Sequence, residues 1–89
     1  MLYLTMAGYG WEGSGPQGIF NTLEEAMSLA EKDCDQFGYE PYADNYWFVM
    51  AWDTEQQKSV KAWHYDKETK SWSSFDCENY KVIPYVKEA

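Results

Sequence analysis

The fold is decided by residues 22–38, which read TLEEAMSLAEKDCDQFG. Apolar residues recur there at the spacing of one helix face. Thr22 followed three residues later by Glu25 is a capping box, which marks a helix start. Gly38 and then Pro41 end the helical pattern. We therefore expect one amphipathic helix over about residues 22–37. Its apolar stripe consists of Leu23, Ala26, Met27, Ala30, Cys34 and Phe37.

Segments on both sides of this helix alternate between two side-chain faces, as β-strands do. Pro84 has no backbone N–H to donate, so the last strand is expected at a sheet edge. The fold class is α+β: an antiparallel sheet of about five to six strands with a single helix on one face, in one domain over residues 1–89. The expected strands are 2–7, a short 18–20, 46–52, 60–65, 71–75 and 80–86, with a glycine-rich loop at 8–18 and polar turns at 53–59 and 66–70.

The net charge excludes two classes of partner. Fifteen acidic residues face seven lysines and no arginine, which gives −8 at pH 7. Nucleic-acid binders need cations to displace counterions from phosphates, and anionic membranes also attract cations. We therefore expect neither direct nucleic-acid binding nor membrane binding. The chain shows no signal peptide and no long apolar run, which predicts a cytoplasmic protein.

The negative charge is concentrated in the first half of the chain. Residues 1–45 hold eight acids and one lysine, a net −7, whereas residues 46–89 hold seven acids and six lysines, a net −1. At 100° per residue, the side chains of Glu24, Glu31 and Asp35 fall within about 40° of one another. Asp33 and Asp35 lie near the helix C-terminus, where the helix dipole favours cations. This departure from a local rule suggests a binding surface, although a solvated face is the simpler interpretation.

The chain lacks a catalytic or metal-binding signature. His64 is the only histidine, and no local pattern pairs it with Cys34 or Cys77, which we expect to be free thiols. One histidine and two distant cysteines do not make a zinc site. We predict no enzyme activity, no cofactor and no metal.

A glycine motif at residues 8–13, GYGWEG, matches the dinucleotide-binding pattern on paper. That motif requires a helix to open at once, so that the helix N-terminus meets the pyrophosphate. Here Gly15 and Pro16 intervene, and the predicted helix begins only near Thr22. A connecting loop is therefore the expected role.

Aromatic residues leave a question about the second face of the sheet. Tyr46, Phe48, Met50 and Trp52 share one side of their strand, and Trp47, Val49 and Ala51 share the other. In the next strand, Trp63 and Tyr65 are expected opposite to Val60, Ala62 and His64. One short helix covers one face, so the other is covered by loops 8–18 and 39–45 with Trp11, or it binds a partner or a second copy.

The opening strand, glycine-rich turn and helix start resemble those of short phage-encoded proteins of unknown function. Those proteins share a G-[IV]-F-x-[ST]-x-E-E-A helix start, met here by Gly18, Ile19, Phe20, Thr22, Glu24, Glu25 and Ala26. The likeness covers roughly residues 2–36 and, weakly, the last strand. Their class includes anti-CRISPR proteins and other inhibitors of host defence, so the resemblance implies a viral protein that inhibits by direct binding.

Three hypotheses follow from these observations. The first is a phage-type inhibitor that binds a host protein with a basic, nucleic-acid-binding surface in the host cytoplasm. The second is a small-molecule sequestering protein with a pocket of Trp47, Trp63 and Trp72. The third is a structural homodimer formed through the outer face of the sheet. The partner-binding residues expected under the first hypothesis are Trp11, Glu24, Glu31, Asp33, Asp35, Tyr39, Glu40, Tyr42 and Asp44.

Overall fold

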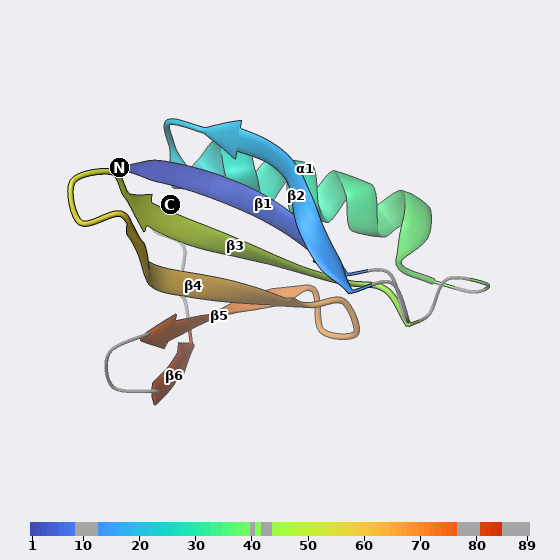
Figure 1. The fold of residues 1–89 in the computed structure, drawn as a ribbon. Coiled ribbons are helices and arrows are strands. Elements are labelled where there is room, and N and C mark those ends of the chain that lie inside the picture. Colours follow the sequence, from blue (N-terminus) through green and yellow to red (C-terminus); the bar gives the residue numbers. More distant parts are fainter. Residues whose placement is uncertain (9–12, 40, 42–43, 77–80, 85–89) are drawn as a thin grey trace.

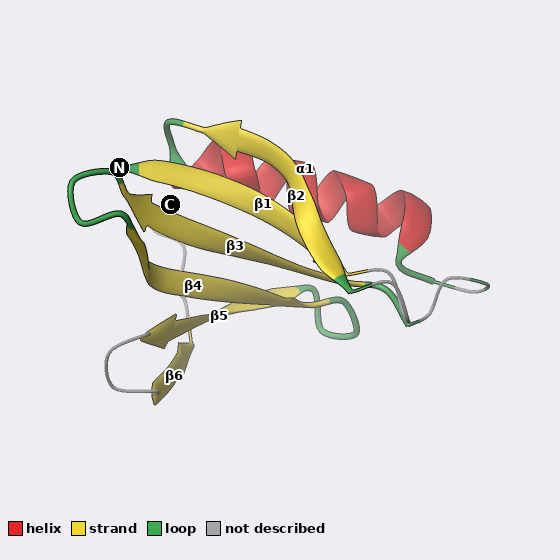
Figure 2. Ribbon diagram, in the orientation of Figure 1, coloured by secondary structure: helices red, strands yellow, loops and turns green. Residues whose placement is uncertain are grey.

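One helix packs against one side of a six-stranded antiparallel sheet in the computed structural model, which describes residues 1–8, 13–39, 41, 44–76 and 81–84 (Figure 1). The strand order is β2-β1-β3-β4-β5-β6, so β1 lies between β2 and β3 (Figure 2). The predicted α+β fold class is confirmed. The elements are β1 (Leu2–Gly8), β2 (Ser14–Phe20), α1 (Leu23–Phe37), β3 (Tyr46–Asp53), β4 (Lys58–Asp66), β5 (Ser71–Asp76) and β6 (Lys81–Pro84).

The helix begins where the capping box predicted. Thr22 is the N-cap, and its Oγ1 accepts a hydrogen bond from the backbone N–H of Glu25 at 3.3 Å. The Thr22 hydroxyl in turn donates to the Glu25 carboxylate at 2.9 Å. These bonds satisfy a free N–H at the helix start and hold the Glu25 side chain over the first turn.

Gly38 ends the helix as expected, but for a different reason. A C-terminal glycine commonly adopts a left-handed conformation, whereas Gly38 has φ of −97°. A Cβ at this position would lie 2.5 Å from the Cys34 carbonyl oxygen and 3.2 Å from the Trp47 ring. Glycine is required here because the chain passes close to the helix and the core.

The segment expected as a glycine-rich loop is in part a strand. β2 begins at Ser14 rather than Gly18, so the prediction of a loop over residues 14–18 is wrong. β2 lies at a sheet edge, where Pro16 is tolerated, and an irregularity in its pairing follows Thr5 of β1. The backbone of β1 supplies the pairing partners, so this strand forms without alternating side chains.

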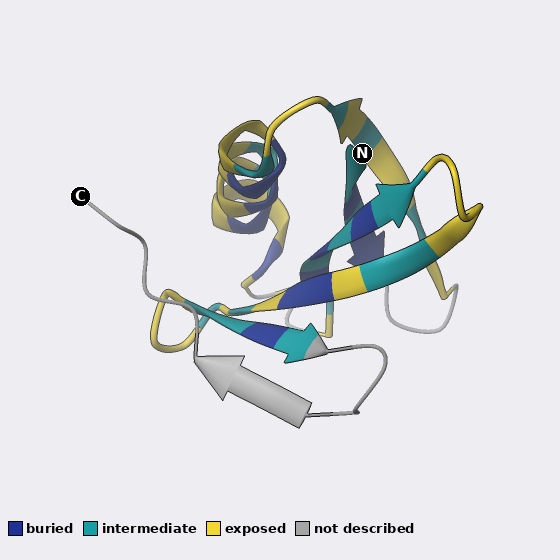
Figure 3. Ribbon diagram, turned by 90° about the vertical axis from the view of Figure 1, so that its left-hand side faces the viewer, coloured by how far each residue is buried: buried dark blue, intermediate teal, exposed yellow. Residues whose placement is uncertain are grey.

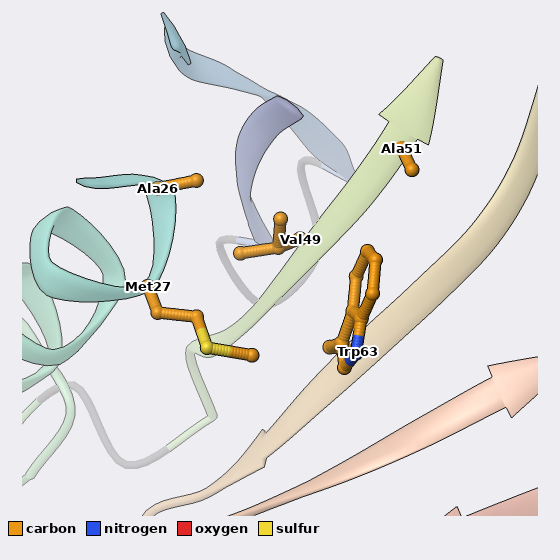
Figure 4. Packing of buried hydrophobic residues seen from close by; sticks show 5 residues of the cluster. All are labelled: Ala26, Met27, Val49, Ala51 and Trp63. Atoms are coloured by element: carbon orange, nitrogen blue, oxygen red, sulfur yellow. The ribbon is translucent and has the colours of Figure 1, made fainter. Parts of the chain in front are cut away.

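The core lies between α1 and the sheet. Ala26 and Met27 of the helix pack against Val49, Ala51 and Trp63, which project from β3 and β4 toward it (Figure 4). A second cluster, formed by Ala7, Ala30, Cys34 and Trp47, continues the core toward the helix C-terminus. Burying these side chains supplies the main driving force for folding.

A buried hydrogen bond ties the helix to the centre of the sheet. Thr5 of β1 is fully buried, and its hydroxyl donates to the Ala26 carbonyl oxygen at 2.7 Å. The bond gives this buried polar group a partner and fixes the position of α1 along β1.

The face assignment of Val60 was wrong. It was expected on the same face as Ala62 and His64, yet it packs against the core under the helix. The register between β3 and β4 shifts between Ala51 and Trp52, which leaves Val60 as the extra residue of a β-bulge. A bulge moves the following side chains to the other face, and simple alternation cannot anticipate it.

Candidate protein-binding surfaces

The outer side of α1 forms an acidic layer on the molecule. Exposed carboxylates on this layer come from Glu24, Glu25, Glu31 and Asp35, while Lys32 is the exposed cation of the helix. The buried side of α1 faces the sheet and its exposed side faces away from it (Figure 3). The charge asymmetry of the sequence therefore becomes an asymmetry between the two sides of the fold.

Two tryptophans of the sheet hold two acids of the helix in place. The indole N–H of Trp72 donates to the Glu31 carboxylate at 2.9 Å, and that of Trp47 donates to the Asp33 carboxylate at 3.3 Å. Asp33 is half-buried, so its position near the helix C-terminus has a structural explanation. It satisfies the N–H of a tryptophan that is 2% exposed.

A groove lies between the acidic layer and the start of β5. Its volume is about 230 Å³, which is below the roughly 300–1,000 Å³ typical of clefts that bind drug-sized ligands.

 A groove of this size suits one extended side chain rather than a whole small ligand. Its walls come from the helix and from the turn before β5, and they include two carboxylates, one lysine and an aromatic ring. The lining residues are Glu24, Met27, Ser28, Glu31, Lys70, Ser71 and Trp72.

The chemistry of this groove suits a cationic side chain. The carboxylates of Glu24 and Glu31 attract a positive charge, and the Trp72 ring offers a face for a cation–π contact. Because the Trp72 N–H already holds Glu31, part of the site is ordered before any partner arrives. An ordered site loses less side-chain entropy on binding.

The other predicted site residues fall into two groups. Tyr39 is exposed, and its hydroxyl donates to the Lys67 carbonyl oxygen at 3.1 Å, so it connects the helix end to the turn after β4. Asp44 is exposed nearby in sequence, beyond Pro41. Trp11, Glu40 and Tyr42 lie outside the described residues. The structure thus brings Glu24 and Glu31 together with Trp72, which sequence reasoning had assigned to a different pocket.

The side of the sheet opposite α1 carries a continuous set of apolar side chains, which we call the open face. No helix lies over it in the described part of the chain (Figure 3). The register places Leu4 and Met50 opposite each other, and Phe48 opposite His64. The open face comprises Leu2, Leu4, Met6, Ile19, Tyr46, Phe48, Met50, Trp52, Ala62, His64 and Phe75.

A row of rings crosses the open face from β3 to β5. Tyr46 and Phe48 stack with their centroids 6.1 Å apart, and Phe48 stacks on His64 at 5.5 Å. His64 then meets the edge of Phe75 at 6.3 Å. These rings cover one another in part, yet Tyr46 remains 45% exposed, and Ile19 on β2 is 62% exposed. The row therefore presents aromatic surface to the outside.

Residues 8–18 and 39–45 were predicted to cover this face. Those of them that the structure describes lie in other places. Residues 14–18 belong to the edge strand β2. In the 39–45 segment, Tyr39 bonds to the turn after β4, and the Asn45 side-chain amide donates to the Phe37 carbonyl oxygen at 3.0 Å. These contacts hold Tyr39 and Asn45 near the end of the helix.

A second cavity, of about 350 Å³, opens at the end of β4 where the open face meets the following turn. His64 and Tyr65, which point to opposite faces of β4, both contribute to it. The other lining residues are Asn45, Tyr46, Trp47, Asp66, Lys67, Glu68 and Ser73. The cavity extends the aromatic row of the open face toward a polar rim.

The tryptophan pocket of the second hypothesis is not present. Trp47 and Trp63 are 2% and 5% exposed in the core, so they do not line an open site. Trp72 is half-buried and belongs to the groove beside α1. A ligand could not stack on all three rings without displacing the helix.

The arrangement of Cys34 and His64 does not form a nucleophilic pair. Cys34 is a buried free thiol of α1, whereas His64 is exposed on the far side of the sheet. Burial raises the pKa of the Cys34 thiol, which lowers its nucleophilicity at neutral pH. Cys77 lies outside the described residues.

The remaining motifs also lack the geometry for cofactor chemistry in the described part of the chain. The glycine motif at residues 8–13 is followed by β2 instead of a helix, so no helix N-terminus follows it to meet a pyrophosphate. Among the described residues, no three His, Cys, Asp or Glu side chains gather as metal ligands. Within the same residues, no helix is long and apolar enough to cross a membrane.

Comparison with known proteins gives no family. The chain matches no protein-family description, no curated protein and no solved structure.

Proposed function

We propose that this chain is a non-enzymatic binding protein that engages a protein partner with a basic surface. The observation that carries the proposal is the groove beside α1, where Glu24 and Glu31 flank Trp72. A lysine or arginine of the partner would enter this groove, with its charge between the carboxylates and its stem along the ring.

The acidic layer around the groove would guide the partner toward it. Exposed acids of one sign raise the rate of encounter with a surface of opposite sign, and this effect weakens with added salt. A basic surface that ordinarily holds nucleic acid is a target of this kind. The proposed role is therefore an inhibitor of a nucleic-acid-handling protein, such as a bacterial defence complex in the cytoplasm of an infected cell.

The test begins with capture of partners from a nuclease-treated bacterial lysate, followed by affinity measurements on the purified partner. The groove variant Glu24→Gln with Glu31→Gln removes two charges, and the amide oxygen introduced by Glu31→Gln can still accept from the Trp72 N–H. We expect about a tenfold or greater loss of affinity. The matched control, Glu55→Gln with Glu68→Gln, removes the same charge from two exposed turns and should bind as the wild type does.

Two outcomes would contradict the proposal. Equal affinity of the groove variant and the wild type would show that the groove does not hold the partner. Equal losses in the groove and control variants would show that net charge, rather than this site, governs binding.

A further inference from the structure

We propose that the open face is a homodimer interface, in which two copies pack their sheets face to face. The resulting particle has four layers, with one helix on each outer side and two sheets between them. This inference is independent of the proposed function, because it concerns the opposite side of the sheet from the groove.

The open face is apolar across its central strands. The register gives β1 and β3 only uncharged residues on this face, from Leu2 to Gly8 and from Tyr46 to Trp52. The charged residue of β4 on this side is Asp66, at the strand end, where its carboxylate accepts the backbone N–H groups of Glu68 and Thr69 at 2.9 and 3.3 Å. An uncharged aromatic face with a polar rim is typical of a protein interface.

The charge distribution selects a second copy as the occupant. A basic partner is drawn to the acidic layer of α1, and the open face offers it no carboxylate at its centre. The face of a second copy is equally uncharged, so neither copy buries an unpaired charge on contact. Two copies related by a twofold axis place the same residues against one another, which a self-complementary apolar face allows.

The placement of the acidic residues on α1, away from the open face, also limits repulsion between two copies that each carry a net charge of −8. Packed sheets lie about 10 Å apart, and the helix layers add to this distance on each side. The acidic layers of the two copies would therefore lie well over the Debye length of about 8 Å apart at physiological salt. Contact through the helices would instead bring the two acidic layers together.

The size of the open face is sufficient for a stable contact. Six strands about 4.8 Å apart and about seven residues long give a projected face of roughly 24 by 24 Å. Two such faces would cover about 1,100 Å², near the lower limit of about 1,000 Å² for a specific interface. We therefore expect a dimer that dissociates on dilution.

Sedimentation equilibrium of the wild-type chain tests this inference without any variant. At tens of micromolar, the expected mass is twice that of the 10.4 kDa chain, and it falls toward 10.4 kDa on dilution. A mass of 10.4 kDa at every concentration, including the millimolar range, would overturn the proposal.

A double variant that leaves the net charge unchanged locates the interface. Leu4→Lys with Met50→Glu places opposite charges on a cross-strand pair, where they satisfy each other within one copy but would be buried in the dimer. We expect this variant to be monomeric while its near-ultraviolet circular dichroism still shows a folded core. The control Asn21→Lys with Gln36→Glu introduces the same residues at exposed positions near the two ends of α1 and should remain dimeric. A folded open-face variant that stays dimeric would place the contact elsewhere and contradict the proposal.

Discussion

Trp47 and Phe48 are neighbours in β3, yet they belong to two different surfaces. Trp47 projects toward α1 and is 2% exposed, whereas Phe48 projects to the open face and is half-buried among other rings. The two faces of the sheet have similar apolar content, but one helix of 15 residues covers only one of them. Alternation thus determines which residues share a face, and the rest of the chain determines which face becomes the core.

The largest expected effect is the difference in lost folding stability between alanine variants of Trp47 and Phe48. Trp47→Ala removes a fully packed ring and should destabilise the fold by about 3–5 kcal/mol. Phe48→Ala removes a half-buried ring and should cost roughly 1 kcal/mol. Urea unfolding at submicromolar concentration, where we expect the proposed dimer to have dissociated, measures both. Equal losses would show that the open face is as tightly packed as the core.

An intermediate effect on the free energy of unfolding is expected at Gly8, where the Tyr46 ring occupies the space that a side chain would fill. The Tyr46 ring lies over Gly8, so a Cβ at Gly8 would overlap the ring. Gly8→Ala should therefore destabilise the fold by about 1–3 kcal/mol, because the ring must move.

Removing the ring should cancel that cost. In the double variant Gly8→Ala with Tyr46→Ala, the clash is absent, so the two effects should be strongly non-additive in a double-mutant cycle. Additive losses would mean that the ring does not occupy this position in solution.

The smallest expected effect is the contribution of Tyr65, on the helix-covered face, to the pH dependence of folding stability. Burial, and then the nearby Glu31 carboxylate, raise the pKa of Tyr65 from 10.0 to about 12. Below pH 10 the phenol is neutral in both the folded and the unfolded chain, and its contribution to stability is fully present. Between pH 10 and about 12 the unfolded chain ionises first, so this contribution is lost as pH rises.

Tyr65→Phe isolates this contribution. Over the same pH window, the stability of the wild type should fall more steeply than that of the variant, as measured by urea unfolding. Parallel pH profiles would show that Tyr65 does not ionise differently in the folded chain.

The elements with their own local signals were predictable. The capping box at Thr22 and the periodic apolar stripe located α1 to within a residue. The alternating segments after it located β3, β4 and β5 to within two residues at each end. Pro84, which lacks an N–H to donate, also correctly predicted that β6 lies at a sheet edge.

The features that depend on a distant partner were not predictable. β2 has no alternating pattern and exists because β1 offers it hydrogen bonds, and Val60 changes face because of a bulge in the pairing with β3. The roles of Glu31 and Asp33 depend on tryptophans 41 and 14 residues away in sequence. A carboxylate near a helix C-terminus could have suggested a tertiary partner, but nothing in the sequence pointed to an indole.

The difference between the two faces is tested most directly by the midpoint of thermal unfolding over a hundredfold range of protein concentration. If the core under α1 folds each copy and the open face joins two copies, the midpoint should rise with concentration, because association stabilises the folded state by mass action. The Leu4→Lys with Met50→Glu variant should show no such rise. A midpoint that is independent of concentration for the wild type would contradict the account and leave the open face without a second copy.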